Sequence, residues 1–510
     1  MKQIMEIEQT SPGAVHVAMD EPRVSDTRGE DGFAPPGISS SLAGPLSGLL
    51  VLAGAGMQGI ANGTMDAFCF GFLLFVAGYA LVKTVFLRGR AEQRAFLLTF
   101  GVCIFAGGAV QWYSLAVFGA PQSFVDAIGF LQAVFDSPPY YTWDEIKTLW
   151  IDGREVSRGA PLAVYIWQGV YHLRRQLGFD FGPYVGVMFN ALVMGFTASV
   201  TVATARELFG DDRWRLRRVG TLFAFCGLFI LFGAILLRDC FTTFFNALVI
   251  LGIVRWLCKP NLRNLLFAAM LTGIAVGAMA YLRFESIVLF GLFWLLGVLS
   301  WLSEERLNTT RFFAIGVGLI VFLFASSYLI EYLDTSLQFR SEKTGAYIDI
   351  LRVSSSQKSL AMRLIVHQPL PIRAVLGVFY LMLFPIPLWA YFFAGAGEYL
   401  LIKGYNGFYQ LFVMPLVLAG ILNVLERFFR EGRRLTPLHF LVIYVLLNTV
   451  GVAVTSLEQR HLAQFLPAMI ILAVVPDTRE RKTRRKVHSI ALIWGFGVIL
   501  VHLGWMTMAR

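Results

Sequence analysis

Long apolar runs are the feature that most constrains this chain. A helix needs roughly 17–25 apolar residues to cross the hydrocarbon core of a bilayer, and about a dozen runs qualify. They are residues 42–62, 64–87, 95–119, 183–204, 218–237, 240–257, 265–282, 284–302, 312–332, 407–425, 438–455, 461–476 and 488–507. Only 15% of the residues are charged, against about 25% in soluble domains. The sequence therefore predicts an all-α, polytopic transmembrane helical bundle of about 12–14 spans.

The first forty residues differ from the rest. Residues 1–40 are polar, contain Pro, Gly and acidic residues, and show no apolar periodicity. We expect them to form a disordered tail. No basic segment leads directly into an apolar core, so they are not interpreted as a signal peptide. Residues 41–510 are expected to form one integral membrane domain.

Clustered arginine and lysine residues predict which loops face the cytoplasm. The clusters are residues 88–94, 206–218, 255–263, 426–434 and 477–486. The positive-inside rule places all five on the cytoplasmic side, together with the N-terminus. This placement accounts for much of the net charge of +10 without a nucleic-acid partner.

Two long loops then face the opposite side and are expected to carry short helices. They are residues 120–182 and residues 334–406. The second is expected to end in a re-entrant or interfacial hairpin, because Pro385 and Pro387 interrupt the apolar stretch 372–403.

The unusual charges gather on this outer face. Arg238 and Asp239 are predicted to form a tight turn between two apolar runs. Other charged residues are expected at the outer ends of further apolar runs. The further residues are Arg283, Glu285, Arg373, Glu458, Arg460 and His461. Charges at span ends also occur without a function, because long side chains reach water from there. However, the planar guanidinium group of arginine can bind two phosphate oxygens at once. Several arginines on one face therefore suggest a site for a lipid phosphate.

Acidic residues of the first outer loop are candidates for catalysis. Asp126 follows directly after a predicted span, and Asp144 and Glu145 form a neighbouring pair in an aromatic setting. A carboxylate in such a place can act as a general base or hold a divalent cation that carries a phosphate. The alternative for each of them is a solvated loop acid.

The order of several stretches resembles the GT-C class of polytopic glycosyltransferases, especially bacterial enzymes similar to protein O-mannosyltransferases. These stretches are SFVDAIGFLQAV, GPYVGVMFNALVMGFTASVTVATARELFG, LLRDCFTTFFNALVILGIVRWL, AYLRFESIVLF, LFPIPLW and EQRHLAQFLPAMIILAV. The resemblance covers roughly residues 120–475. It implies transfer of a sugar from a polyprenyl-phosphate donor to a glycan, lipid or protein acceptor on the outer face.

The resemblance also implies roles for individual residues. Asp126 would be the catalytic base or a metal-associated acid, with Mg²⁺ or Mn²⁺ as the possible cation. The lipid phosphate would be bound by Arg238, Arg283 and Arg460. The supporting residues would be Asp239, Glu285, Glu458, His461, Asp144 and Glu145. No Asp-x-Asp motif lies near Asp126, which departs from the metal-binding pattern.

Other functions remain open at the level of sequence. A polymerase or ligase of polysaccharide repeat units linked to lipid pyrophosphate would use outer arginines similarly. A transporter or flippase would show broken helices and ionisable residues near the middle of the membrane. In each case the protein is expected in the inner (plasma) membrane, with its site facing the periplasm or the outside.

Overall fold

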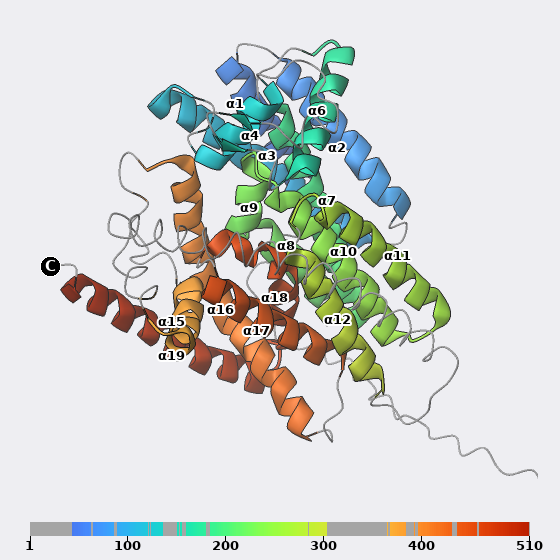
Figure 1. Cartoon of the computed structure of the whole chain (residues 1–510), viewed down its shortest axis with the longest axis vertical. Coiled ribbons are helices and arrows are strands. Elements are labelled where there is room, and N and C mark those ends of the chain that lie inside the picture. The colour runs from blue at the N-terminus through green and yellow to red at the C-terminus, as the bar shows by residue number, and fades with distance from the viewer. Residues whose placement is uncertain are drawn as a thin grey trace, which may run out of the picture. The chain divides into compact units, whose positions relative to one another are not determined.

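The computed structural model describes residues 43–62, 65–85, 89–120, 122, 124–135, 150–151, 154–155, 160–179, 184–283, 285–302, 365, 368–383, 392, 396–430, 436–455 and 458–508. All of them belong to one compact unit, residues 37–510. The predicted tail, residues 1–40, lies outside the described residues. Figure 1 shows the arrangement of the helices.

Helices make up almost all of the described structure (Figure 1). In chain order they are α1 (Ala43–Asn62), α2 (Asp66–Val85), α3 (Arg90–Phe118), α4 (Val125–Phe135), α6 (Pro161–Gln176), α7 (Val185–Phe209), α8 (Arg213–Ala224), α9 (Gly227–Ala234), α10 (Asp239–Cys258), α11 (Leu262–Met279), α12 (Glu285–Leu302), α15 (Leu370–Leu383), α16 (Glu398–Arg430), α17 (Pro437–Thr455), the 3₁₀ helix η2 (Gln459–Gln464), α18 (Leu466–Ala473) and α19 (Arg481–Met508). Two short antiparallel strands, β1 (Trp150–Ile151) and β2 (Arg154–Glu155), lie in the first long loop.

The all-α polytopic bundle is confirmed. Among the described residues, seven helices are long and apolar enough to cross a membrane, and α8 with α9 makes an eighth if this bent pair is one span. Three shorter apolar segments lie in α1, α15 and α17. The predicted span 312–332 and the turn 384–391 lie outside the described residues.

Two predicted spans are not continuous helices. The segment 218–237 is divided into α8 and α9, which meet at an angle of 54°. The segment 461–476 consists of the end of η2 and the short helix α18. At the break before α9, the side-chain oxygen of Asn406 accepts a hydrogen bond from the N–H of Leu228. This contact satisfies a backbone donor that a continuous helix would bond internally.

The centre of the bundle is α7. Its apolar window is 89% buried, whereas the windows of α2 and α19 are only 22% and 17% buried. A helix that is apolar on all sides is stable where other helices surround it, and α7 contacts α2, α3, α6, α8, α9 and α10. The exposed apolar faces of α2 and α19 are suited to contact with lipid.

Glycine allows two pairs of helices to approach closely. A side chain at Gly420 of α16 would place its Cβ 2.0 Å from the carbonyl oxygen of Leu472 on α18. A Cβ at Gly108 of α3 would lie 2.4 Å from the carbonyl oxygen of Gly54 on α1. Small residues of this kind are typical of packed helices in membranes, where close backbone contact replaces burial from water.

The described parts of the five basic clusters meet at one end of the bundle, which we call the basic end. Arg206 pairs with Glu92 at 2.8 Å, which joins the first two clusters. Lys259 pairs with Glu207 at 3.0 Å, and Arg479 pairs with Asp212 at 3.0 Å. In the same way, Lys486 of the last cluster contacts Glu426 of the fourth at 2.8 Å. The clusters therefore share one face, as expected from their predicted common location.

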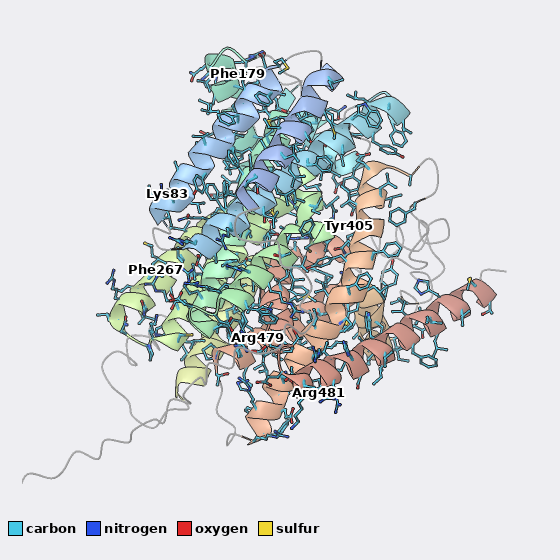
Figure 2. The ribbon with its side chains drawn as sticks, turned by 180° about the vertical axis from the view of Figure 1, so that it is seen from behind. Lys83, Phe179, Phe267, Tyr405, Arg479 and Arg481 are labelled. Carbon is cyan, nitrogen blue, oxygen red and sulfur yellow. The ribbon has the colours of Figure 1, made fainter. Side chains whose placement is uncertain are left out.

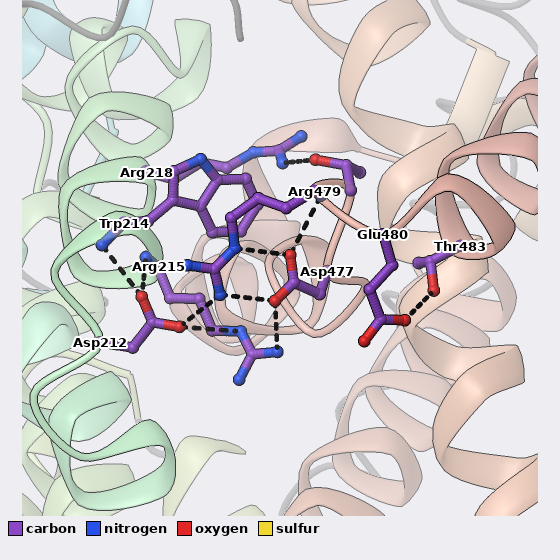
Figure 3. A network of polar contacts seen from close by, with 9 residues as sticks. Asp212, Trp214, Arg215, Arg218, Asp477, Arg479, Glu480 and Thr483 are labelled. Atoms are coloured by element: carbon purple, nitrogen blue, oxygen red, sulfur yellow. Dashed lines mark hydrogen bonds and ion pairs between the residues drawn. The ribbon is translucent and has the colours of Figure 1, made fainter. Parts of the chain in front are cut away.

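Figure 3 shows how two of these clusters are joined. Asp212 caps α8 by accepting from the N–H groups of Trp214 and Arg215. Arg479 bridges Asp212 and Asp477, and its guanidinium lies over the Trp214 ring. The hydrogen bond from Arg479 is the main reason that the pKa of Asp477 is lowered. This network fixes the connection between α18 and α19 against α8.

Candidate functional site

The turn that carries Arg238 is held in place by a buried asparagine. Asn190 of α7 donates to the carbonyl oxygens of Ile235 and Leu237, at 3.2 and 3.3 Å. Its own side-chain oxygen accepts from the Trp167 indole at 2.8 Å. The chain between α9 and α10 is extended at Ile235, so its carbonyls need partners outside the helices. Asn190 supplies them and thereby fixes the position of Arg238.

Two of the predicted outer turns lie side by side. Arg283 Nη1 is 3.3 Å from Asp239 Oδ1, and Arg238 Nη1 donates to the carbonyl oxygen of Leu282 at 3.3 Å. The two turns therefore hold each other: Arg238 of the turn between α9 and α10 bonds to the turn between α11 and α12, and Arg283 of the latter pairs with Asp239 at the start of α10. Asp239 also stands in the first turn of α10, where the helix dipole favours a negative charge.

One contact joins the first outer loop to the last outer turn. Arg460 of η2 forms a hydrogen-bonded ion pair with Asp126 of α4, which lies 334 residues earlier. The guanidinium also lies 5.8 Å from the centre of the Phe124 ring. Asp126 keeps 43% of its side-chain surface exposed and Arg460 keeps 24%. The acid is therefore paired and still accessible from the surface.

The start of α16 adds three residues that the sequence analysis did not single out. Glu398 accepts from the N–H of Phe124 at 3.2 Å, and the Tyr399 ring stacks on the Phe124 ring with centres 3.8 Å apart. Tyr399 and Lys403 both bond to the carboxylate of Glu458. Tyr399 and Lys403 are four residues apart in α16 and therefore lie on one face of the helix, which was the signal available in the sequence.

Because η2 also packs against α10, these contacts bring eight charged residues to one end of the bundle, and we call them the charged cluster. Its cations are Arg238, Arg283, Lys403 and Arg460, and its acids are Asp126, Asp239, Glu398 and Glu458. α10 begins at Asp239 and is 20 residues long, so the basic end lies about 30 Å away at 1.5 Å per residue.

The pKa shifts around η2 reflect this concentration of charge. Burial raises the pKa of Glu458, but the charges of Lys403 and Arg460 outweigh it and lower the pKa overall. For Arg460, burial lowers the pKa, but Asp239 and other negative groups outweigh burial, so the pKa is raised overall. The pKa of His461 is well below its ordinary value because of burial and the nearby positive charges, Arg283 first among them. Near neutral pH, His461 is therefore the uncharged member of this region.

The structure does not bring the other predicted site residues into the charged cluster by a described contact. Glu285 is the first residue of α12, next to the Arg283 turn in sequence, and its side chain is outside the description. Asp144 and Glu145 lie outside the described residues. Arg373 is on α15, and the Leu381 carbonyl of that helix accepts from Gln459 Nε2 at 3.3 Å. At 1.5 Å per residue, Arg373 lies about 12 Å along the helix from this contact.

Among the described residues, no group of three or more His, Cys, Asp or Glu side chains could hold a metal ion. The carboxylate of Asp126 already has a cationic partner in Arg460.

The arrangement places arginine donors, an accessible carboxylate and aromatic rings next to one another at a helix-bundle end. No protein-family model matches this sequence, and no curated protein matches it either.

Proposed function

We propose that this protein is a membrane transferase that moves a sugar from a polyprenyl-phosphate donor to a hydroxyl-bearing acceptor. The observation that carries the proposal is the ion pair between Asp126 and Arg460 beside the Arg283–Asp239 pair. It puts an accessible acid next to several arginines, at one end of an apolar bundle. The resemblance to GT-C glycosyltransferases supports the same reading.

The proposed reaction assigns separate tasks to the acid and the cations. Asp126 takes the proton of the acceptor hydroxyl as that oxygen attacks the anomeric carbon. The bond from this carbon to the phosphate oxygen breaks, and polyprenyl phosphate leaves with the electron pair. Arg238, Arg283 and Arg460 stabilise the phosphate charge. A phosphate beside Arg460 competes with Asp126 for the guanidinium and so frees the carboxylate to act as a base.

Neighbouring residues keep these groups in position. Glu398 and Tyr399 hold Phe124, which immediately precedes α4 and Asp126. Lys403 and Tyr399 hold Glu458, two residues before Arg460. No step requires a metal ion.

The proposal can be tested with the purified full-length protein in nanodiscs. Polyprenyl-phosphate hexoses and pentoses carrying a radiolabelled sugar are incubated with membrane lipid and glycan acceptors, and the released polyprenyl phosphate is measured. We expect Asp126→Asn to lower transfer at least about 100-fold, with unchanged elution in size-exclusion chromatography. Asp211→Asn, an exposed acid at the basic end, is the matched control. Normal transfer by Asp126→Asn would remove this residue from the mechanism.

Transport is the second candidate, because of one observation. The α8–α9 pair is bent by 54°, and α9 is a short buried helix followed by an extended segment. Broken helices of this kind line substrate pathways in transporters. Movement of the intact donor across the membrane, without release of polyprenyl phosphate, would favour transport. Polymer formation from pyrophosphate-linked repeat units would instead favour a polymerase or ligase.

A further inference from the structure

A second site lies on another side of the bundle, in a groove of about 1020 Å³ between α2, α7, α10 and α11. Its wall is formed almost entirely by apolar side chains, among them Leu81, Phe196, Leu248 and Leu271. Figure 2 shows this side of the molecule, with Lys83 of α2 and Phe267 of α11 labelled. This volume lies at the upper end of the range of about 300–1,000 Å³ that is typical of ligand pockets.

The groove follows the helices for most of their length. On α10 its lining runs from Phe241 to Arg255, which is about 21 Å at 1.5 Å per residue. One leaflet of a bilayer contributes about 15 Å of hydrocarbon. A lipid in the groove would therefore lie along the protein with its chains extended past the middle of the membrane.

The charges show which end of the groove receives a head group. Every charged residue among the described lining residues lies at the basic end: Glu92, Arg206, Glu207 and Arg255. The other end is lined by Ile166, Phe189 and Phe241. A polyprenyl-phosphate donor in the charged cluster would need its phosphate at this apolar end, so the groove does not suit that molecule.

At the mouth, Arg255 of the lining and Lys259, one helical turn beyond it, are more exposed than Glu207, the acid that pairs with both. Arg255 and Lys259 keep 40% and 66% of their side-chain surface exposed, and both contact the less exposed Glu207, at 3.7 and 3.0 Å. Lys83, also exposed, lies in the last turn of α2. Glu92 is buried against Arg206, and the exposed Asp211 also pairs with Arg206. Arg255 and Lys259 are therefore accessible to an incoming phosphate.

We propose that this groove is a binding site for an anionic, two-chain glycerophospholipid of the leaflet at the basic end. Its acyl chains lie between α2, α7, α10 and α11, and its phosphate is bound by Arg255 and Lys259. Anionic lipids are attracted to basic surfaces of membrane proteins. This site is separate from the charged cluster and does not depend on the proposed transfer reaction.

Native mass spectrometry of the delipidated full-length protein tests the proposal. The probes are palmitoyl-oleoyl phosphatidylglycerol and the matching phosphatidylcholine. We expect one phosphatidylglycerol to bind about tenfold more tightly than phosphatidylcholine, as charge-assisted contacts predict. The double variant Arg255→Ala, Lys259→Ala should lose this preference. Arg263→Ala, an exposed arginine of α11 outside the groove lining, should keep it. Equal binding of the two lipids by the unaltered protein would show that Arg255 and Lys259 do not select an anionic head group.

A pair of variants on one helix tests the groove itself. Ala77→Trp fills the groove from α2, whereas Ala80→Trp adds the same side chain at an exposed position of α2 outside the lining. We expect only Ala77→Trp to abolish tight phosphatidylglycerol binding. If Ala77→Trp does not fold, Leu248→Trp on α10 serves with Leu266→Trp on α11 as its control. Retained binding in the folded groove variant would refute the site. Displacement of phosphatidylglycerol by polyprenyl phosphate, or occupation by a second copy of the chain, would also refute it.

Discussion

The guanidinium Nη1 of Arg283 lies 3.3 Å from Oδ1 of Asp239, and the two side chains keep only 10% and 5% of their surface exposed. Breaking one half of such a pair leaves a buried charge without its partner. We expect Arg283→Ala to lower the free energy of unfolding by about 3 kcal/mol. The double variant Arg283→Gln, Asp239→Asn should lose less than the sum of its single variants, with a coupling of about 1–3 kcal/mol. Unfolding in mild detergent measures all of them, and simple additivity would contradict a direct pair.

Arg238 is expected to contribute mainly to donor binding. Its position is fixed by the Asn190-bonded turn and by its hydrogen bond to the Leu282 carbonyl. We expect Arg238→Ala to weaken binding of polyprenyl-phosphate sugar about 10- to 100-fold, the range for a lost charged hydrogen bond. Arg238→Lys should fall in between, because it keeps the charge but not the planar fork. Arg263→Ala is the control, and equal binding by Arg238→Ala would make this arginine an ordinary span-end charge.

The depressed pKa of His461 predicts a loss of stability in mild acid. Burial and nearby arginines hold His461 neutral in the folded protein, whereas the unfolded chain takes up a proton near pH 6.5. The unfolded state is therefore favoured as the pH falls below about 6.5, by at most about 1.4 kcal/mol per pH unit. We expect His461→Gln to lose less stability than the unaltered protein between about pH 7 and pH 5. Parallel stability curves would show that His461 is protonated equally in both states.

Cysteine labelling tests the predicted orientation of the bundle. Ser354 and Ser456 are expected outside, whereas Asp211 at the basic end is expected in the cytoplasm. Single-cysteine variants at these positions are treated with a membrane-impermeant maleimide, after Cys69→Ser removes the exposed native thiol. We expect labelling of intact cells at Ser354→Cys and Ser456→Cys, and labelling at Asp211→Cys only after permeabilisation. The opposite pattern would reverse the sides.

Gly420 should tolerate no larger residue. A Cβ there would lie 2.0 Å from the Leu472 carbonyl oxygen, so Gly420→Ala must push α16 away from α18. We expect a cost of about 1–3 kcal/mol, as for overpacked cores. Gly273→Ala on α11, where nothing lies within 4 Å, is the matched control in thermal unfolding. Equal stability of the two variants would show that α16 and α18 are not in close contact.

The helices were predictable from the sequence because each apolar run carries its own signal. Charges between the runs also indicated the turns of Arg238, Arg283 and Arg460. The pairing was not predictable, because Asp126 and Arg460 are 334 residues apart and no local pattern connects them. The three residues at the start of α16 were overlooked because they stand at the edge of a long apolar run. The break before α9 contains no proline, and Asn406, whose side chain accepts a hydrogen bond there, comes from a distant helix.

The Asp126–Arg460 pair also makes the order of synthesis important. Asp126 leaves the ribosome 334 residues before Arg460, which at 5–20 residues per second is about 20–70 s. During that time Asp126 cannot pair with Arg460. The charged cluster can close only after the late spans have been inserted. A nascent chain that stops before Arg460 therefore differs from a finished one, because its Asp126 lacks this partner.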